Sequence, residues 1–379
     1  MARGACLLAA VLVLGACTGG PSTPATSPSP SPSPTGPAAA PEQPAPAPAP
    51  PAPTPAWPDA SGGPVVVAEG LDVPWGLAFL PDGSALVTLR DSGEVVQVRA
   101  GAAPRVVGTV PGVVPGGEGG LLGIAVSPGF AQDRRVFVYL SAATDNRVLR
   151  MRLDGELVPD RVVVEGIPRA GNHNGGRLAF GPDGFLYVTT GDAQRPANAQ
   201  DRASLGGKIL RVDADGAPAP GNPFGSAVWS LGHRNVQGLD WADDGTMYAS
   251  EFGQNTWDEL NVITPGANYG WPDVEGSGDV AGYTDPVAQW RTGDASPSGI
   301  AVAGDAVYLA ALRGEALWRV PRGGGEPQRL LHEAYGRLRA VETDGTGNLW
   351  VLTSNTFRGE PRPGDDQVVV LDPATLGEG

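Results

Sequence analysis

One of the three histidines of this chain stands in a glycine-rich segment that suits a ligand-facing loop. His173 lies within Gly-Asn-His-Asn-Gly-Gly-Arg, residues 171–177. Glycines on both sides give a bare, tightly turned loop that a ligand can approach closely. A neutral imidazole there takes a proton from a hydroxyl near pH 7. We therefore expect a general base at His173. The alternative is a loop histidine that is hydrogen-bonded to backbone. A chain with only three histidines cannot form a His-rich metal site.

A second polar cluster, Leu-Gly-His-Arg-Asn-Val-Gln-Gly at residues 231–238, stands directly before an apolar strand pattern. Arg234 is a fixed cation, suited to polarising a carbonyl oxygen or holding an anion, and Asn235 adds oriented hydrogen bonds. An Arg–Asp bridge of purely structural role is the alternative.

Two further arginines alternate in Gly-Arg-Leu-Arg-Ala, residues 336–340. On a strand, Arg337 and Arg339 project to the same side. Two guanidinium groups on one side favour an anion that carries several carboxylates or phosphates. Arg313 is a candidate third member, and exposed surface arginines are the alternative.

Hard oxygen donors gather in residues 250–261, Ser-Glu-Phe-Gly-Gln-Asn-Thr-Trp-Asp-Glu-Leu-Asn, and in residues 266–272, Gly-Ala-Asn-Tyr-Gly-Trp-Pro. Carboxylates, amides and exposed backbone carbonyls are the ligands that calcium prefers. The spacing is not that of an EF-hand, so a site here would draw on several loops. A solvated acidic loop is the alternative.

These motifs are spread over a chain that repeats one unit: a short strand, an Asp-Gly turn and a second strand. The clearest copies are residues 75–88, 176–189 and 238–250, and weaker copies begin at Gly123, Gly299 and Leu338. Asp-Gly supplies the positive φ of a tight hairpin turn. Six such hairpins predict an all-β fold, a six-bladed β-propeller over residues 63–379. Two β-sandwiches in tandem are the alternative.

Two details of this propeller follow from the spacing. We expect inserted loops on one face at about 141–173, 191–230 and 251–298, because the repeats are unevenly spaced. We also expect Val65–Ala68 and Val368–Leu371 to pair in one blade and close the ring, which removes free sheet edges.

The start of the chain is a targeting segment. An arginine is followed by a short apolar run and by Leu-Gly-Ala-Cys, residues 14–17, which resembles a bacterial lipobox. We expect a lipoprotein signal peptide at 1–16, lipidation of Cys17, and a disordered Pro/Ser/Thr/Ala linker over 17–62. The protein would then be exported and held by lipid alone at the outer face of the bacterial cell membrane. An ordinary cleaved signal is the alternative.

Taken together, the motifs resemble those of the PQQ-dependent aldose sugar dehydrogenases, relatives of soluble quinoprotein glucose dehydrogenase. The resemblance covers most of 63–372 and is carried by the order of five segments: 117–123, the surroundings of His173, 207–211, 232–238 and 268–272. It implies oxidation of an aldose at C1 to the lactone, with PQQ and Ca²⁺ as cofactors. The implied partners are a small aldose and an external electron acceptor, either a quinone or a redox protein.

The resemblance also implies a role for particular residues. His173 matches the general base, and Arg234 and Asn235 match residues that contact the quinone oxygens. The other matches are Arg313, Arg337 and Arg339 for the cofactor carboxylates, Glu118 and Trp290 for the sugar, the carbonyls of Gly253 and Gln254 for the calcium on PQQ, and Glu259 and Tyr269 for a second calcium.

Two positions depart from the glucose dehydrogenase branch. Asn172 stands where that branch has an Asp that would orient the histidine, and Gln254 replaces a Pro. The loops are shorter than in the glucose dehydrogenase branch. This difference implies a broader aldose range and a surface less prone to dimerise, so we expect a monomer. The net charge of −15 argues against nucleic acid as a partner. Two rival functions remain: a calcium-dependent propeller lactonase and a non-catalytic propeller binding module.

Overall fold

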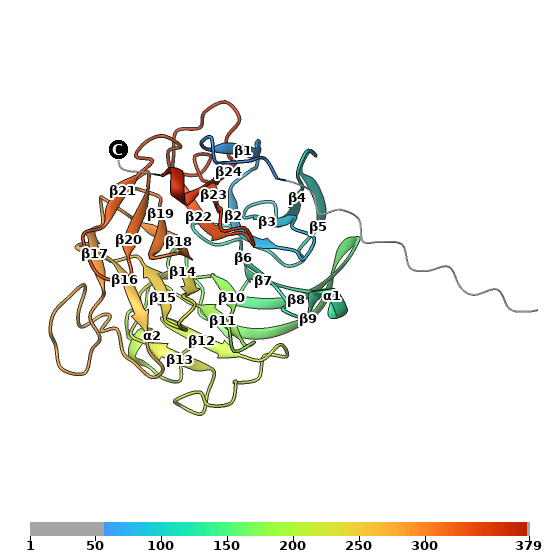
Figure 1. Ribbon diagram of the computed structural model, residues 1–379. Helices are drawn as coiled ribbons and strands as arrows, with labels where there is room; N and C mark the ends of the chain where they lie inside the picture. Colours follow the sequence, from blue (N-terminus) through green and yellow to red (C-terminus); the bar gives the residue numbers. More distant parts are fainter. Residues whose placement is uncertain (1–56, 377–379) are drawn as a thin grey trace, which may run out of the picture. The chain divides into compact units, whose positions relative to one another are not determined.

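Residues 57–376 form six antiparallel sheets of four strands each, arranged around a ring (Figure 1). The computed structural model describes residues 57–376. The expected signal peptide (1–16), Cys17 and most of the linker (17–62) therefore lie outside the described residues. Each sheet forms one blade, and the bounds of its strands are, from the innermost outwards: blade 1, β2 (Pro74–Phe79), β3 (Ala85–Leu89), β4 (Glu94–Val98), β5 (Arg105–Thr109); blade 2, β6 (Leu121–Val126), β7 (Arg135–Ser141), β8 (Asn146–Asp154), β9 (Glu156–Ile167); blade 3, β10 (Leu178–Phe180), β11 (Leu186–Thr189), β12 (Lys208–Val212), β13 (Val228–Leu231); blade 4, β14 (Val236–Trp241), β15 (Met247–Glu251), β16 (Trp257–Ile263), β17 (Ala288–Arg291); blade 5, β18 (Pro297–Ala303), β19 (Ala306–Ala311), β20 (Ala316–Pro321), β21 (Gln328–Leu330); blade 6, β22 (Leu338–Thr343), β23 (Leu349–Thr353), β24 (Val368–Leu371), β1 (Val65–Ala68).

The innermost strands form the wall of the ring. Each of them contacts the next, in the order β2, β6, β10, β14, β18, β22, and β22 returns to β2. This closure confirms the six-bladed propeller and excludes two tandem sandwiches. The repeated hairpins of the sequence are the first two strands of each blade, and the turn glycines Gly83, Gly184 and Gly245 have φ of +80°, +79° and +86°. Only glycine adopts these angles without strain.

The core lies between the blades, where apolar faces of neighbouring sheets meet. Trp75 of blade 1 packs with Leu122 and Tyr139 of blade 2 and with Leu178 of blade 3. Burying one such side chain stabilises the fold by about 1.5–3 kcal/mol. Because neighbouring blades cover both faces of each sheet, inner strands such as β3, β11 and β23 are buried along their whole length, whereas the outermost strands β5, β9 and β21 are partly exposed.

Blade 6 closes the ring by pairing the two ends of the propeller. β1 runs antiparallel to β24, with Val65 opposite Val370 and Val66 opposite Val369, which confirms the expected pairing. Residues before β1 also pack here. The ring of Trp57 meets that of Trp350 edge-on at 4.5 Å, and its Nε1 donates to the Gly83 carbonyl at 3.0 Å. The packed body thus begins before residue 63, the expected start of the propeller, because Trp57 packs on an apolar surface. The Pro-rich sequence before it did not indicate this contact.

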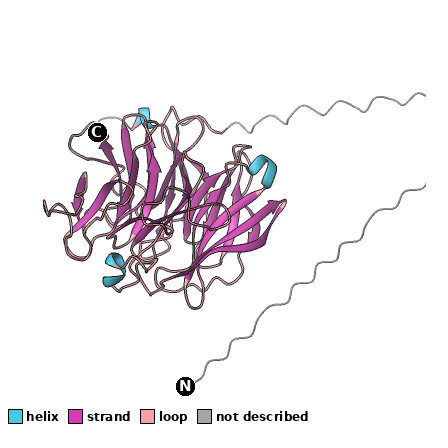
Figure 2. Ribbon diagram, turned by 90° about the horizontal axis from the view of Figure 1, so that it is seen from below, coloured by secondary structure: helices cyan, strands magenta, loops and turns pink. Residues whose placement is uncertain are grey.

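The spans expected as inserted loops turn out to contain strands. Residues 141–173 are mainly the hairpin of β8 and β9, and the other two spans include β12 and the pair β16 and β17. Charged residues are spread along β8 and β9, which hid their strand character in the sequence. Figure 2 shows the strands running between loops at the two faces. The helices among residues 57–376 are short, α1 (Phe130–Asp133), α2 (Ala197–Gln200) and the 3-10 turn η1 (Pro373–Thr375), and none of them could cross a bilayer.

Candidate active site

A polar cavity of about 510 Å³ lies at one end of the ring. Every blade contributes to it from the first residues of its innermost strand or from the segment just before that strand. The six contributions are Trp75, Glu118, His173, Arg234, Ser296 and Arg337. Because the innermost strands converge on the axis, these segments meet although they are far apart in sequence. The cavity is therefore a product of the repeat itself.

His173 lies in a tightly packed turn, and the neighbouring positions Gly175 and Gly191 have no space for a side chain. Its φ is +61°, in the left-handed region, and its carbonyl accepts the amide of Ala193 at 3.1 Å. A Cβ on Gly191 would lie 2.0 Å from that carbonyl oxygen, and a Cβ on Gly175 would lie 2.5 Å from Cα of Thr190. The glycines around His173 thus serve close packing of two backbone segments, which fixes where the imidazole points.

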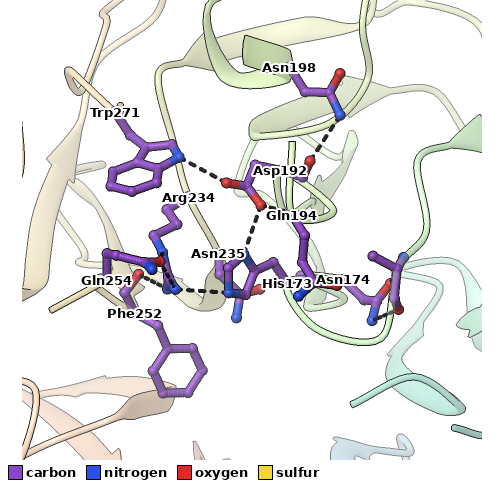
Figure 3. A network of polar contacts seen from close by, with 12 residues as sticks. His173, Asn174, Asp192, Gln194, Asn198, Arg234, Asn235, Phe252, Gln254 and Trp271 are labelled. Carbon is purple, nitrogen blue, oxygen red and sulfur yellow. Dashed lines mark hydrogen bonds and ion pairs between the residues drawn. The ribbon is translucent and has the colours of Figure 1, made fainter. Parts of the chain in front are cut away.

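Asp192 orients the imidazole ring of His173 (Figure 3). Its Oδ1 lies 2.8 Å from Nδ1 of His173 and also accepts the amide of Gln194 at 2.8 Å. Its Oδ2 accepts Nε1 of Trp271 at 2.9 Å, and only 1% of its side chain is exposed. A carboxylate accepts hydrogen bonds, so Nδ1 of His173 carries the proton and Nε2 presents a lone pair.

Arg234 faces that lone pair. Its Nη2 lies 2.8 Å from Nε2 of His173, and its Nη1 donates to the Phe252 carbonyl at 3.0 Å. Its Nε donates to Oε1 of Gln254 at 2.8 Å. Burial lowers the pKa of Arg234, although Asp192 and Glu251 oppose this shift. The expected convergence of His173 and Arg234 on one cavity is therefore found.

Gln254 contributes more than its backbone. The family resemblance assigned a role only to its backbone carbonyl. The structure shows that the Gln254 side chain holds the Arg234 guanidinium through both Nε and Nη2. Asn235 also has a second contact, because its Oδ1 accepts the amide of Gly175 at 3.0 Å and so links the Arg234 and His173 segments.

The opposite wall of the cavity is strongly cationic. Arg337 and Arg339 line it, as their spacing predicted, and so does Arg313, the candidate third member. Arg339 is 5% exposed, and burial together with Arg337 and other nearby cations lowers its pKa to about 9. The Nε atoms of Arg337 and Arg339 are buried and have no hydrogen-bond partner among the described residues. Their Nη1 atoms donate to neutral groups, the Leu312 carbonyl at 3.3 Å and Oε1 of Gln237 at 3.0 Å, so the positive charge of this wall suits an anionic ligand.

Two more arginines line the cavity but already have acidic partners. Arg90 forms a two-point pair with Asp91, from Nε at 2.7 Å and from Nη2 at 3.0 Å. Arg358 lies 3.3 Å from Oε1 of Glu118. The other oxygen of Glu118 accepts the amide of His173 at 3.1 Å, so this carboxylate links the histidine segment to the rim. Neither arginine was expected from the sequence.

The segment proposed for calcium borders the same cavity. Gly253 lines both the main cavity and a small adjoining one, which Glu259, Tyr269, Glu251 and Glu275 also line. Burial, with the charge of Glu251 nearby, raises the pKa of Glu259 to about 8. Within residues 57–376 no three acidic, histidine or cysteine side chains are arranged around a metal position. Of the two residues expected to offer carbonyls to calcium, Gly253 lines the main cavity and Gln254 lines neither cavity.

Trp290 is the candidate residue that the structure moves out of the site. It lies on β17, the outermost strand of blade 4, is 6% exposed, and packs against Trp318 with ring centroids 5.7 Å apart. Its ring fills the core between blades 4 and 5 and offers no stacking face to a sugar. The sequence also missed Asp192. A carboxylate directly after the second strand of a repeat, in Thr-Gly-Asp, is the signal that could have indicated it.

Comparisons with known proteins agree with this geometry. The sequence profile described as Glucose / Sorbosone dehydrogenase matches residues 71–359. The chain is 34% identical to the aldose sugar dehydrogenase YliI of Escherichia coli, over 77% of this chain and 90% of that protein. It is 32% identical to quinoprotein glucose dehydrogenase B of Acinetobacter calcoaceticus, over 58% of this chain and 54% of that protein. The PQQ-bound structure of aldose sugar dehydrogenase from Streptomyces coelicolor is similar with a TM-score of 0.79 and 53% identity, covering 81% of this chain and 96% of that one.

Proposed function

Because the chain belongs to the glucose/sorbosone dehydrogenase family, whose members include aldose sugar dehydrogenases, we propose that it oxidises aldoses at C1 to the lactone with PQQ and calcium. The observation that carries this proposal is the lone pair of His173 Nε2, held toward a cavity whose far wall is cationic. A sugar hydroxyl is a weak acid, so its oxidation needs a base at this position.

The residues present fit a flat, polyanionic cofactor. Arg313, Arg337 and Arg339 would hold the PQQ carboxylates, since all three line the cavity and the last two donate to neutral groups. Arg234 and Asn235 would contact the quinone oxygens of PQQ. The carbonyls of Gly253 and Gln254 would hold the calcium on PQQ, and Glu259 and Tyr269 a second ion. When bound, PQQ would supply the hydride acceptor and calcium a Lewis acid.

The chain's own residues then handle the proton and the orientation. Nε2 of His173 takes the proton of the C1 hydroxyl, and Asp192 stabilises the imidazolium that forms. Nη2 of Arg234 contacts Nε2 in this structure, so the sugar hydroxyl must replace that contact before the proton moves. Glu118 lies on the same side as His173 and is placed to accept a sugar hydroxyl.

The test is reconstitution of the chelator-treated protein with PQQ and calcium. We expect dye-linked oxidation of glucose and other aldoses, and a change in cofactor absorbance when sugar is added. His173→Gln should bind PQQ but turn over at least about 100-fold more slowly. Absence of both PQQ binding and aldose oxidation would reject the proposal. Lactone hydrolysis without PQQ would point to the lactonase, and ligand binding without turnover to a binding module.

We further propose that the protein is exported as a monomer, lipidated on Cys17, and passes its electrons to an external quinone or redox protein. The lipobox-like residues 14–17 support the lipidation. Mass spectrometry of the mature N-terminus tests it: Cys17→Ala should release the protein from the membrane fraction. An unmodified Cys17 in mature protein, or unchanged fractionation of the variant, would contradict it.

A further inference from the structure

Glu275 makes an unusual set of contacts beside the cavity. One of its oxygens, Oε1, accepts four successive backbone amides, those of Gln254 at 2.7 Å, Asn255 at 3.0 Å, Thr256 at 2.8 Å and Trp257 at 3.1 Å. Carboxylates that accept backbone amides form strong, charge-assisted hydrogen bonds. The whole turn between β15 and β16 is therefore gathered around one oxygen atom that comes from a different loop.

This arrangement dictates where the carbonyl groups of the turn point. In a trans peptide the C=O of one residue and the N–H of the next point in opposite directions. The Gly253–Gln254 and Gln254–Asn255 peptides are not among the cis bonds of the structure. Since the amides of Gln254 and Asn255 point at Glu275, the carbonyls of Gly253 and Gln254 must point away from it.

The preceding peptide shows the same rule at work. The amide of Gly253 donates to Oδ1 of Asp258 at 2.9 Å, while the carbonyl of Phe252, across that peptide, accepts Nη1 of Arg234 at 3.0 Å. Among residues 57–376, by contrast, no hydrogen-bond donor reaches the carbonyl oxygen of Gly253 or of Gln254. Gly253 has no side chain, so it lines the cavity with backbone atoms.

We propose that Glu275 is the positioning residue that presents the Gly253 and Gln254 carbonyls, as a pair, to a divalent cation. This inference rests on the proposed function, in which those carbonyls bind calcium. It adds the reason why two carbonyls of a loop stay oriented before the ion arrives. The four hydrogen bonds to Glu275 already order the turn, so the ion does not have to order it on binding. Glu275 acts through the backbone and need not touch the ion on PQQ.

The experiment compares calcium binding and amide exchange in the purified, chelator-treated protein. Glu275→Gln removes the charge while keeping the shape, and Glu275→Ala removes the acceptor. We expect calcium affinity at the main cavity to fall by about 10- to 100-fold, the range found when groups that orient metal ligands are removed. We also expect the amides of residues 254–257 to exchange faster with deuterium, a readout that needs no metal, PQQ or sugar.

Two further variants keep the outcome interpretable. Asp213→Asn alters a turn carboxylate that accepts two amides at 2.9 Å but lines neither cavity, so its calcium affinity should stay at the wild-type value. Glu259→Gln assigns any second binding event to the small cavity. If the wild type binds no calcium, the proposed calcium role fails. If it binds calcium and both Glu275 variants bind it equally well, with unchanged exchange at 254–257, the Glu275 proposal is overturned.

Discussion

Replacing Asp192 by Asn tests the tautomer on which the proposed proton transfer depends. The carboxylate accepts Nδ1–H of His173 on one oxygen and Nε1–H of Trp271 on the other. An asparagine has one acceptor oxygen and one amide donor, so one of these contacts must be lost. If the new amide faces His173, Nδ1 becomes the acceptor and Nε2 carries the proton, which removes the base.

The size of the effect follows from the charge that develops. Proton uptake turns His173 into a cation beside Asp192, whose side chain is 1% exposed. Two unit charges about 4 Å apart at an effective dielectric constant of about 20 interact by about 4 kcal/mol. The cation of Arg234 opposes part of this gain, which leaves about 2–4 kcal/mol. We therefore expect kcat to fall by about 30- to 1,000-fold.

The assay is steady-state dye-linked oxidation of an aldose at saturating PQQ and calcium, with PQQ affinity measured separately by absorbance titration. Asp192 does not line the cavity, so the affinity should stay within about threefold of wild type. Trp271→Phe keeps the carboxylate and should lose much less activity than Asp192→Asn. A kcat for Asp192→Asn within threefold of wild type would refute the assigned tautomer. So would a full additional loss in the His173→Gln background, because the two residues should act as a unit.

Three other changes have expected outcomes. Arg339→Met should weaken PQQ binding by about 100-fold or more in an absorbance titration. It should also raise the melting temperature of the cofactor-free protein, because it removes a buried guanidinium whose pKa is lowered to about 9. A lower melting temperature would contradict this. Gly191→Ala should lower the free energy of unfolding in urea by about 2–4 kcal/mol, since the new methyl group clashes with the His173 carbonyl. It should lower kcat more than PQQ affinity. An unchanged kcat would show that the turn accommodates the methyl group without moving His173. Glu342→Gln should remove a pH dependence of stability: burial raises the pKa of Glu342 to about 8 despite Arg177, so the folded state binds more protons than the unfolded one and wild-type stability falls from about pH 4.5 to 8. Parallel unfolding curves for variant and wild type across this range would argue against it.

Much of the fold could be predicted because it repeats. Six hairpins with Asp-Gly turns indicate radial blades, and the polar motifs stand directly before innermost strands, so their convergence follows from the ring. The place of Asp192 after the second strand of a repeat marks it as a candidate, but its contact with His173, like those of Glu275, depends on different loops meeting in space and does not follow from the repeat. Trp290 was misplaced for a related reason: on an outermost strand, alternate side chains point into the neighbouring blade, and sequence alone does not show which ones do.

The pairing of β1 with β24 also constrains how the chain can mature. Among the strands of residues 57–376, β1 is the first to leave the ribosome and its partner β24 is the last, so β1 lacks this partner until Val368–Leu371 are made. Blades 1–5 each consist of consecutive strands and can form in turn as synthesis proceeds, whereas blade 6 waits. A polypeptide that ends before β24 would therefore keep the contact of β22 with β2 but leave β1 without a partner and the edge of β23 unpaired, and such open strand edges favour self-association or degradation by quality-control proteases.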